Sequence, residues 1–241
     1  MKKPVMLIYG IVSHAVVLAC FAYWGLWNYR AIPNHIDSGV ARGPLVAFAM
    51  NTVILALYCA AHSYLARWSF KQWLRRFFPH NLERATYCLF FSLLLVGLCF
   101  AYQPMPRLLW QVTSASGRNV MLALYLGSWA LHFAAIFWIN YAEFFGLRQT
   151  WLAARGEEYR QPAPQTRRDF AISHIILIVS LSMIPWMTPE MSVGQIYFCS
   201  FVTVYNVIGA WLSGRDMSDT PDPIEVSRSP SHPVSQPDVT G

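Results

Sequence analysis

Residues 85–102 read ATYCLFFSLLLVGLCFAY, a run of apolar and small residues without one charged side chain. A stretch of about 20 such residues is typical of a helix that crosses a lipid bilayer. Lipid offers no partner for free backbone N–H and C=O groups, so a chain that crosses it is expected to be helical. The sequence holds six stretches of this kind, and we predict membrane helices over residues 4–27, 44–66, 85–102, 120–145, 170–187 and 191–212.

The composition indicates the same class of protein. Hydrophobic residues make up 55% of the chain and charged residues only 12%, which is too apolar for an ordinary soluble domain. The net charge of +6 could suggest nucleic acid, but the basic residues lie between the apolar runs. We therefore predict the lipid bilayer as the main partner and no nucleic acid. All five cysteines lie within apolar runs without metal-ligand spacing, so we expect neither a disulfide framework nor a metal site.

The distribution of basic residues predicts the orientation. Of the 18 Lys and Arg residues, 14 lie in the N-terminus, the second and fourth connections and the tail, and four lie in the other connections. Positively charged segments remain on the cytoplasmic side of a membrane. We therefore expect a multi-pass protein of a bacterial-type inner (plasma) membrane with both termini in the cytoplasm.

The chain divides into a membrane domain, residues 1–217, and a tail, residues 218–241. The tail is rich in Pro, Ser and Asp and has few apolar residues to bury, so we expect it to be disordered and cytoplasmic. The predicted fold class is all-α: an integral membrane helical bundle of about six transmembrane helices with a disordered C-terminal tail.

Several ionisable residues lie at the predicted cytoplasmic ends of four helices. Such groups are costly to bury in a membrane, so each is a candidate for function. Together they predict a polar site at the cytoplasmic interface, formed by His62, Glu143, Arg148, Arg167, Arg168, His174, Arg215 and Asp216. The alternative is structural, since long Arg side chains anchor helix ends in the headgroup layer. Glu143 could simply pair with Arg148 across a helix end.

Two further histidines, His14 and His132, fall near the middle of the membrane. Two imidazoles at one depth on facing helices could ligate a haem. Hydrogen bonds between helices are the alternative explanation.

Short motifs along most of the chain resemble one family of membrane enzymes. They are Ile32-Pro33 with Ile36-Asp37-Ser38-Gly39, Ala61-His62-Ser63-Tyr64-Leu65-Ala66-Arg67, Glu83-Arg84-Ala85-Thr86-Tyr87, Gln103-Pro104-Met105-Pro106, Phe145-Gly146-Leu147-Arg148-Gln149 and Thr188-Pro189. In order and spacing, these motifs resemble the methanethiol S-methyltransferase family, which belongs with the isoprenylcysteine carboxyl methyltransferase-like proteins. The resemblance covers roughly residues 5–217.

The resemblance implies a helical bundle that takes S-adenosylmethionine from the cytoplasmic side and methylates a small thiol. It places His174 and His62 in the catalytic role. We assign the binding of the methyl donor to the candidates Arg167, Arg168, Arg215, Asp216, Glu143 and Arg148.

The sequence departs from the family pattern at two places. A family Tyr-Arg and Arg-His-Pro precede the fifth helix, whereas only His174 corresponds here. A family Glu-Glu-Arg-Asp-Leu follows the sixth helix, whereas Ser213-Gly214-Arg215-Asp216-Met217 stands here without either glutamate. Three functions follow: an S-adenosylmethionine-dependent thiol methyltransferase with a remodelled donor site, a non-catalytic accessory protein with a membrane protein partner, or, as a minor alternative, a haem-binding protein.

Overall fold

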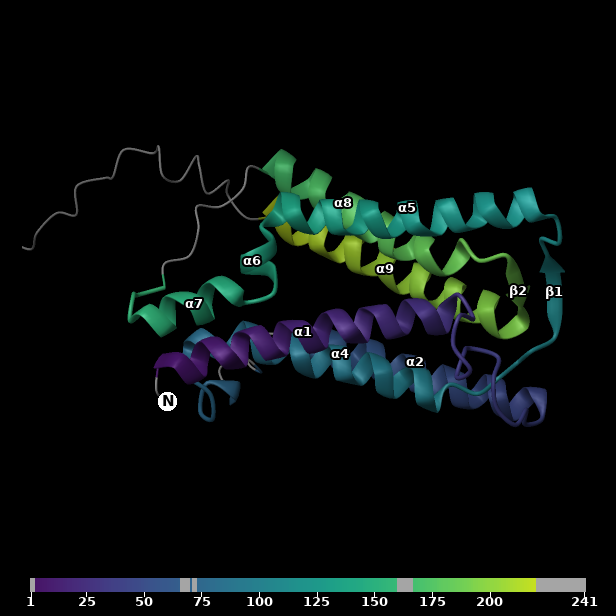
Figure 1. The fold of residues 1–241 in the computed structure, drawn as a ribbon, viewed down its shortest axis with the longest axis horizontal. Helices are drawn as coiled ribbons and strands as arrows, with labels where there is room; N and C mark the ends of the chain where they lie inside the picture. Colours follow the sequence, from purple (N-terminus) through teal and green to yellow (C-terminus); the bar gives the residue numbers. More distant parts are fainter. Residues whose placement is uncertain (1–2, 66–69, 71–72, 160–166, 220–241) are drawn as a thin grey trace, which may run out of the picture.

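The computed structural model describes residues 3–65, 70, 73–159 and 167–219, apart from the side chains of Lys3, Arg167, Phe170 and residues 212–219. Six long helices run alternately in opposite directions and form one elongated bundle (Figure 1). They are α1 (Lys3–Asn28), α2 (Pro44–Leu65), α4 (Glu83–Ala101), α5 (Ala115–Ile139), α8 (Arg167–Met183) and α9 (Val193–Asp219). The all-α membrane bundle predicted from the sequence is therefore confirmed.

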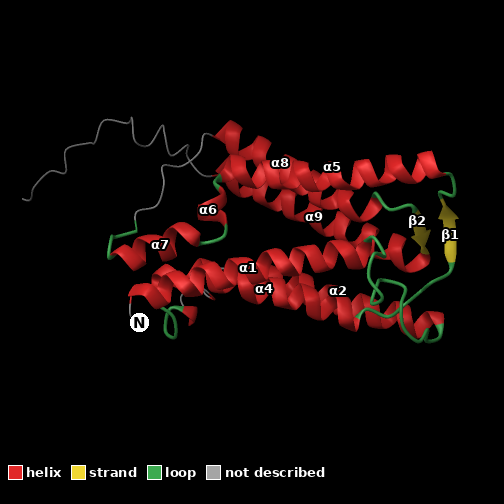
Figure 2. Ribbon diagram, viewed as in Figure 1, coloured by secondary structure: helices red, strands yellow, loops and turns green. Residues whose placement is uncertain are grey.

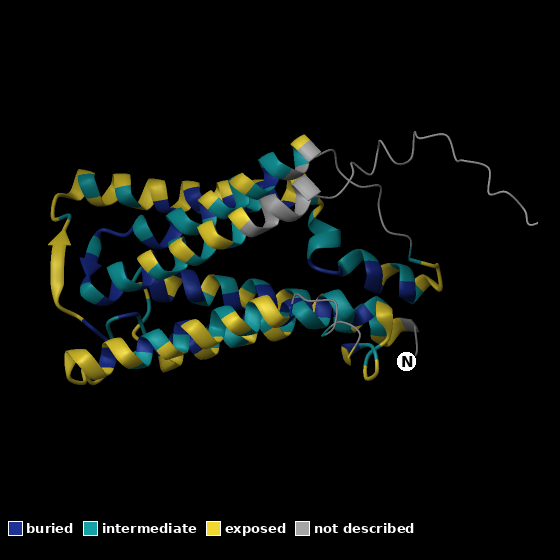
Figure 3. Cartoon of the chain, turned by 180° about the vertical axis from the view of Figure 1, so that it is seen from behind, coloured by how far each residue is buried: buried dark blue, intermediate teal, exposed yellow. Residues whose placement is uncertain are grey.

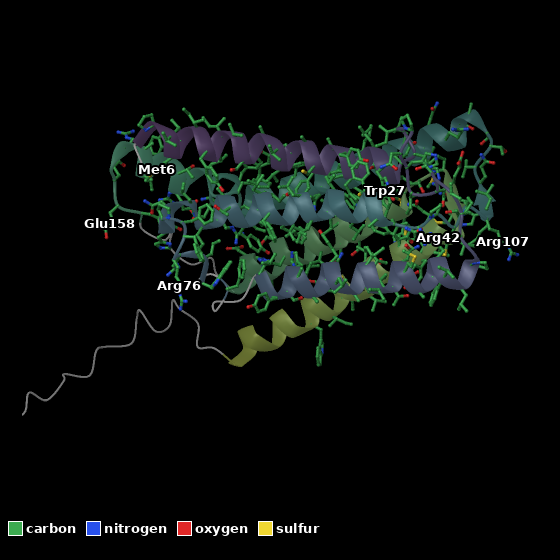
Figure 4. All side chains as sticks on the ribbon, turned by 90° about the horizontal axis from the view of Figure 1, so that it is seen from below. Met6, Trp27, Arg42, Arg76, Arg107 and Glu158 are labelled. Carbon is green, nitrogen blue, oxygen red and sulfur yellow. The ribbon has the colours of Figure 1, made fainter. Side chains whose placement is uncertain are left out.

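The bundle has two distinct ends. The start of α1 and the end of α9 lie at the same end, which we call the terminal end (Figure 1). The connections α1–α2, α4–α5 and α8–α9 lie at the other, which we call the loop end. Figure 4 shows the labelled residues Met6, Arg76 and Glu158 at the terminal end, and Arg42 and Arg107 at the loop end.

Five helices in the described part of the chain are long and apolar enough to cross a membrane. They are Pro4–Asn28, Pro44–Leu65, His80–Ala101, Ala115–Ile139 and Val193–Trp211. The predicted fifth stretch appears as a shorter apolar helix, Ala171–Trp186, packed between α5 and α9. Its last turn is the 3-10 helix η2 (Ile184–Trp186), which begins where Pro185 removes a backbone donor. Exposed residues recur along the outside of the helices (yellow in Figure 3), and many of them are large and apolar, as expected of a bundle surrounded by lipid.

Aromatic side chains fill the half of the core nearer the loop end. Trp27 of α1 is 1% exposed, and its ring lies 5.7 Å from Tyr102 and 5.5 Å from Phe198 of α9. A second cluster nearer the terminal end joins Val17, Cys88, Ile136 and Phe145. All five cysteines are free thiols, four of them buried and Cys59 half-buried.

The fourth apolar stretch does not continue to residue 145 as predicted. Helix α5 ends at Ile139, because Asn140 has a φ of 116° and turns the chain. Asparagine tolerates positive φ better than most residues, and the side-chain oxygen of Asn140 also accepts from the backbone N–H of Glu143 at 3.2 Å. The short helix α6 (Tyr141–Phe144) follows, and after Gly146 the chain enters α7 (Leu147–Arg155).

Two glycines allow α7 and the turn before it to pack closely against α1 and α4. A Cβ on Gly10 of α1 would lie 2.2 Å from Oγ1 of Thr150. Gly146 has a φ of 78°, and a Cβ there would lie 2.6 Å from the backbone N of Ala85. Arg84 donates from Nε to the carbonyl oxygen of Phe144 at 2.8 Å, which fixes the same corner.

Replacing Gly146 by alanine should destabilise the protein by about 2 kcal/mol, because the new Cβ meets backbone and the φ is unfavourable for L-residues. The unfolding temperature in detergent measures this effect. Gly127→Ala in α5 is the control: nothing lies within 4 Å of that position, and alanine favours a helix. Equal melting temperatures for the two variants would contradict the prediction.

The loop end contains two short strands that the sequence did not predict (Figure 2). Strand β1 (Leu108–Gln111) pairs antiparallel with β2 (Glu190–Ser192), with Trp110 opposite Met191. The strand pair connects the α4–α5 connection to the α8–α9 connection.

At its C-terminal end, α9 continues to Asp219, beyond the predicted boundary at residue 212. Apart from its first two positions, the expected disordered tail lies outside the described residues.

Candidate functional site

The elements that carry the predicted site residues all lie at the terminal end of the bundle, although no hydrogen bond or ion pair within the described residues joins Glu143 or Arg148 to His62 or His174. The last turn of α2 carries His62, α6 and α7 carry Glu143 and Arg148, and the first turns of α8 carry Arg168 and His174. Figure 1 shows these elements together with the end of α9. The antiparallel arrangement of the helices, which the sequence predicted, is what brings them to one end.

Glu143 is the best-defined acidic group at this end. Its Oε1 accepts a hydrogen bond from Gln149 Nε2 at 2.6 Å and another from the hydroxyl of Tyr159. Its Oε2 lies 3.7 Å from Arg148 Nη1, so the predicted Glu143–Arg148 pair is present. The Arg148 side chain is 39% exposed, and an ion pair with so open a partner adds little stability.

Two buried acceptor atoms beside this pair have no hydrogen-bond partner within the described residues. They are Oε2 of Glu143 and Oε1 of Gln149. Buried polar atoms in proteins are nearly always hydrogen-bonded, so these two acceptors can each take a further donor. The two atoms make this corner a candidate site for a group with N–H donors.

Tyr159 has a donor role in this cluster. Burial, together with the hydrogen-bonded carboxylate of Glu143, raises the pKa of Tyr159 to about 12. The phenol therefore stays protonated through the neutral pH range and donates a hydrogen bond to Glu143.

His62 is held by the last helix. Its Nδ1 lies 3.0 Å from the hydroxyl of Tyr205 in α9, and its ring packs edge-on against Phe91 at 4.2 Å. The Tyr205 hydroxyl also lies 3.1 Å from Ser63 Oγ. Beside this contact, an apolar groove of about 370 Å³ runs between α2 and α9, lined by Cys59, Tyr197, Ser200, Phe201, Val204, Tyr205 and Ile208.

The remaining predicted site residues lie on α8 and α9, and fewer of their side-chain contacts are described. His174 is half-buried in α8, with its Nδ1 3.5 Å from Ser173 Oγ, and Arg168 is exposed. The side chains of Arg167, Arg215 and Asp216 lie outside the described part, although their backbone belongs to α8 and α9. The roles of these residues remain predictions.

The two mid-membrane histidines have protein partners. His14 Nε2 lies 2.8 Å from the Tyr141 hydroxyl, and His132 Nδ1 lies 3.2 Å from Ser180 Oγ. These are the hydrogen bonds between elements that the alternative explanation predicts. Among the described residues, no group of three or more His, Cys, Asp or Glu side chains is placed to hold a metal ion.

Sequence reasoning missed Tyr159, Tyr205 and Tyr141 as parts of this end. Each contacts a predicted or considered residue, namely Glu143, His62 and His14. Tyrosines are common near the ends of membrane helices, so their position alone gave no signal. Only the three-dimensional contacts separate them from the other tyrosines of the chain.

Comparison with known proteins gives close relatives. The chain is 33% identical over 218 residues to the methanethiol S-methyltransferase of Mycobacterium tuberculosis, covering 90% of this chain and 89% of the relative. It is 34% identical over 189 residues to the methanethiol S-methyltransferase of a Pseudomonas species, covering 78% and 73%. A more distant relative is nurim of Sus scrofa, 25% identical over 181 residues and covering 72% and 69%.

No family model matches the chain. No solved structure matches it either. The match with the first relative covers nearly the whole of both chains at more than 30% identity. The chain belongs to the methanethiol S-methyltransferase family.

Proposed function

We propose that this protein transfers a methyl group from S-adenosylmethionine to a small thiol, at the terminal end of the bundle. The observation that carries the proposal is the 33% identity with a methanethiol S-methyltransferase over 90% of the chain. The substrate in that relative's name is methanethiol, whose methylation gives dimethyl sulfide. The cluster around Glu143 supports the location.

The residues at this corner fit the charged groups of the donor. S-adenosylmethionine carries an ammonium and a carboxylate and supplies a methyl group activated by a positive sulfur. Glu143 Oε2, which faces Arg148 without a hydrogen bond, and the acceptor Gln149 Oε1 suit the ammonium. The half-exposed guanidinium of Arg148 suits the carboxylate. Glu143 would then supply the negative charge that Ser213 and Gly214 do not provide.

Two histidines are the candidates for proton acceptor. Methyl transfer forms a bond between the thiol sulfur and the methyl carbon, breaks the bond to the donor sulfur and releases the thiol proton. A neutral imidazole of His62 or His174 would accept that proton. His62 lies beside the apolar groove between α2 and α9, and Tyr205 fixes its ring.

A second candidate is a non-catalytic relative that binds another membrane protein. Two features of the sequence favour it: Ser213-Gly214 replaces the family's acidic pair, and the family's arginine before His174 is absent. Unpaired donor charges are costly to bring into a site of low dielectric constant. Under this alternative the protein binds S-adenosylmethionine weakly or not at all.

One experiment separates the two candidates. Purified protein in detergent is titrated with S-adenosylmethionine in a calorimeter, and membranes that carry it are given methanethiol while dimethyl sulfide is measured. Donor binding together with methylation that disappears in His174→Ala supports the enzyme. Absence of both, for protein that is folded by its melting curve, supports the non-catalytic relative.

We also propose that the terminal end faces the cytoplasm of a cell with a bacterial-type plasma membrane. The placement of the start of α1 and the end of α9 at one end of the bundle and the 14-to-4 division of basic residues support this. Reporter fusions after Gly241 should report the cytoplasm, and fusions within residues 112–117 should report the opposite side. A reporter after Gly241 that is active outside the cytoplasm would contradict the orientation.

A further inference from the structure

The loop end contains a polar cavity that the proposed reaction does not use. Its volume is about 520 Å³. Its lining residues come from the α1–α2 connection, from β1 and β2 or just before them, and from the start of α5. These elements lie at the opposite end of the bundle from α6, which carries Glu143 (Figure 1). The residues that line it are Tyr29, Arg30, Ala31, His35, Asp37, Pro106, Leu108, Arg118, Pro189 and Glu190.

Arg30 forms the fixed wall of this cavity. Its Nη2 lies 2.5 Å from Oδ2 of Asp37 and donates to Ser192 Oγ at 3.2 Å. Its Nη1 donates to the carbonyl oxygen of Glu190 at 2.9 Å. Its φ is 59°, the left-handed conformation that glycine usually supplies at this point after a helix. The backbone bonds from Arg30 to Trp27 and from Ala31 to Leu26 complete that helix end. The bonds of the Arg30 side chain stabilise this unusual conformation.

The two carboxylates that line the cavity, Asp37 and Glu190, both have partners within the protein. Asp37 pairs with Arg30 and accepts from Ser192 Oγ at 2.8 Å. Glu190 accepts from Gln111 Nε2 at 3.0 Å, and its second oxygen lies 3.9 Å from Arg30 Nε. The Arg30 guanidinium offsets the charge of Asp37 and lies near the half-exposed Glu190, so the repulsion of an anion by these two carboxylates is reduced.

Three donors remain for a ligand. Arg118, in the first turn of α5, is exposed and has no ion-pair partner within the described residues. Burial raises the pKa of the Tyr29 hydroxyl, and the charge of Arg118 lowers it in part, so the two groups are close. His35 Nδ1 accepts from the backbone N–H of Asp37 at 3.3 Å, which leaves the proton of a neutral ring on Nε2.

A guanidinium, a phenol and an imidazole N–H suit a ligand with several anionic oxygens. The positive end of the α5 helix dipole favours the same charge. Next to the cavity, Leu108, Leu109 and Trp110 of β1 are 48%, 49% and 44% exposed. Such side chains at the end of a membrane bundle suit the boundary between headgroups and acyl chains.

We propose that this cavity binds a phosphate group through Arg118, Tyr29 and His35. The phosphate comes from a phospholipid headgroup in the leaflet at the loop end or from a soluble phosphate ester. The site is separate from methyl transfer, because it lies at the other end of the bundle from Glu143 and His62. It would anchor this end in the headgroup layer.

Native mass spectrometry of delipidated full-length protein in detergent tests the proposal. The probes are dioleoyl phosphatidylglycerol, glycerol 3-phosphate and, as a lipid without phosphate, dioleoylglycerol. Phosphatidylglycerol should bind, and Arg118→Gln should weaken binding about tenfold because a charge-assisted hydrogen bond is lost. Tyr29→Phe should weaken it a few-fold. The control Arg42→Gln removes an equal charge from an exposed residue of the same end that does not line the cavity.

Each outcome of the titration is informative. Binding of glycerol 3-phosphate that depends on Arg118 supports phosphate recognition from the soluble source. Binding of phosphatidylglycerol alone, with the same dependence, supports the lipid source. Equal effects of Arg118→Gln and Arg42→Gln, equal binding of dioleoylglycerol, or binding of neither phosphate probe overturns the proposal.

Discussion

Replacing Glu143 by glutamine should weaken the binding of S-adenosylmethionine about 10- to 100-fold. The change removes one negative charge and keeps the size of the side chain. Hydrogen bonds to a charged group are worth about 1.5–3 kcal/mol, which corresponds to that range. A glutamine can still accept from Gln149 and Tyr159, so the fold should survive. Calorimetric titration with S-adenosylmethionine measures the effect, and a melting curve in detergent checks the fold.

Glu157→Gln is the matched control for this prediction. Glu157 lies in the same connection and pairs with Arg155 at 2.6 Å, but its side chain is 47% exposed. The same chemical change there should leave donor binding unaltered, since solvent screens an exposed pair. Equal losses in both variants would indicate a general effect of charge at the terminal end. Unchanged binding in Glu143→Gln would remove Glu143 from the donor site.

The helices of this bundle were predictable from the sequence because lipid imposes a simple rule. An apolar run of bilayer length must be helical, and five of the six predicted runs are helices that meet that length. The rule says little about where such a run bends. Asn140 ends α5 within the predicted fourth run, because one residue with positive φ outweighs the apolar pattern around it.

The paired strands at the loop end escaped prediction for a related reason. Strands β1 and β2 have four and three residues and lie 79 positions apart in the register Gln111–Glu190. Pairing over such a distance leaves no local periodicity. Their partnership depends on the antiparallel packing of helices that lie between them in the sequence.

The ion pairs of Arg30 with Asp37 and Glu190 at the loop end could have been expected from where the few charged residues lie along the sequence. Only two acidic residues, Asp37 and Glu190, fall in the three connections of this side, and two of those connections carry its four arginines. Opposite charges in a segment with so few charges are expected to find each other. The structure joins both acidic residues to Arg30. The proposed donor site at the terminal end, in contrast, includes side chains outside the described part.

Replacing Arg30 by methionine should destabilise the protein by about 3–5 kcal/mol. The side chain of Asp37 is 9% exposed, and removing its partner leaves a buried carboxylate without an opposite charge. The variant also loses the bonds to the Glu190 carbonyl and to Ser192, which hold β2 against the end of α1. The melting temperature in detergent should fall accordingly, whereas Arg42→Met, which removes an exposed arginine of the same connection, should have little effect.

A double variant distinguishes loss of the ion pair from loss of the arginine's other contacts. If the unpaired carboxylate causes most of the damage, Arg30→Met combined with Asp37→Asn should recover more than half of the lost stability, because the charge is gone. Asparagine can still accept the hydrogen bond from Ser192 Oγ through its carbonyl oxygen. No recovery would assign the stability to the bonds with β2. A melting temperature for Arg30→Met equal to that of Arg42→Met would show that the ion pairs of Arg30 do not stabilise the loop end.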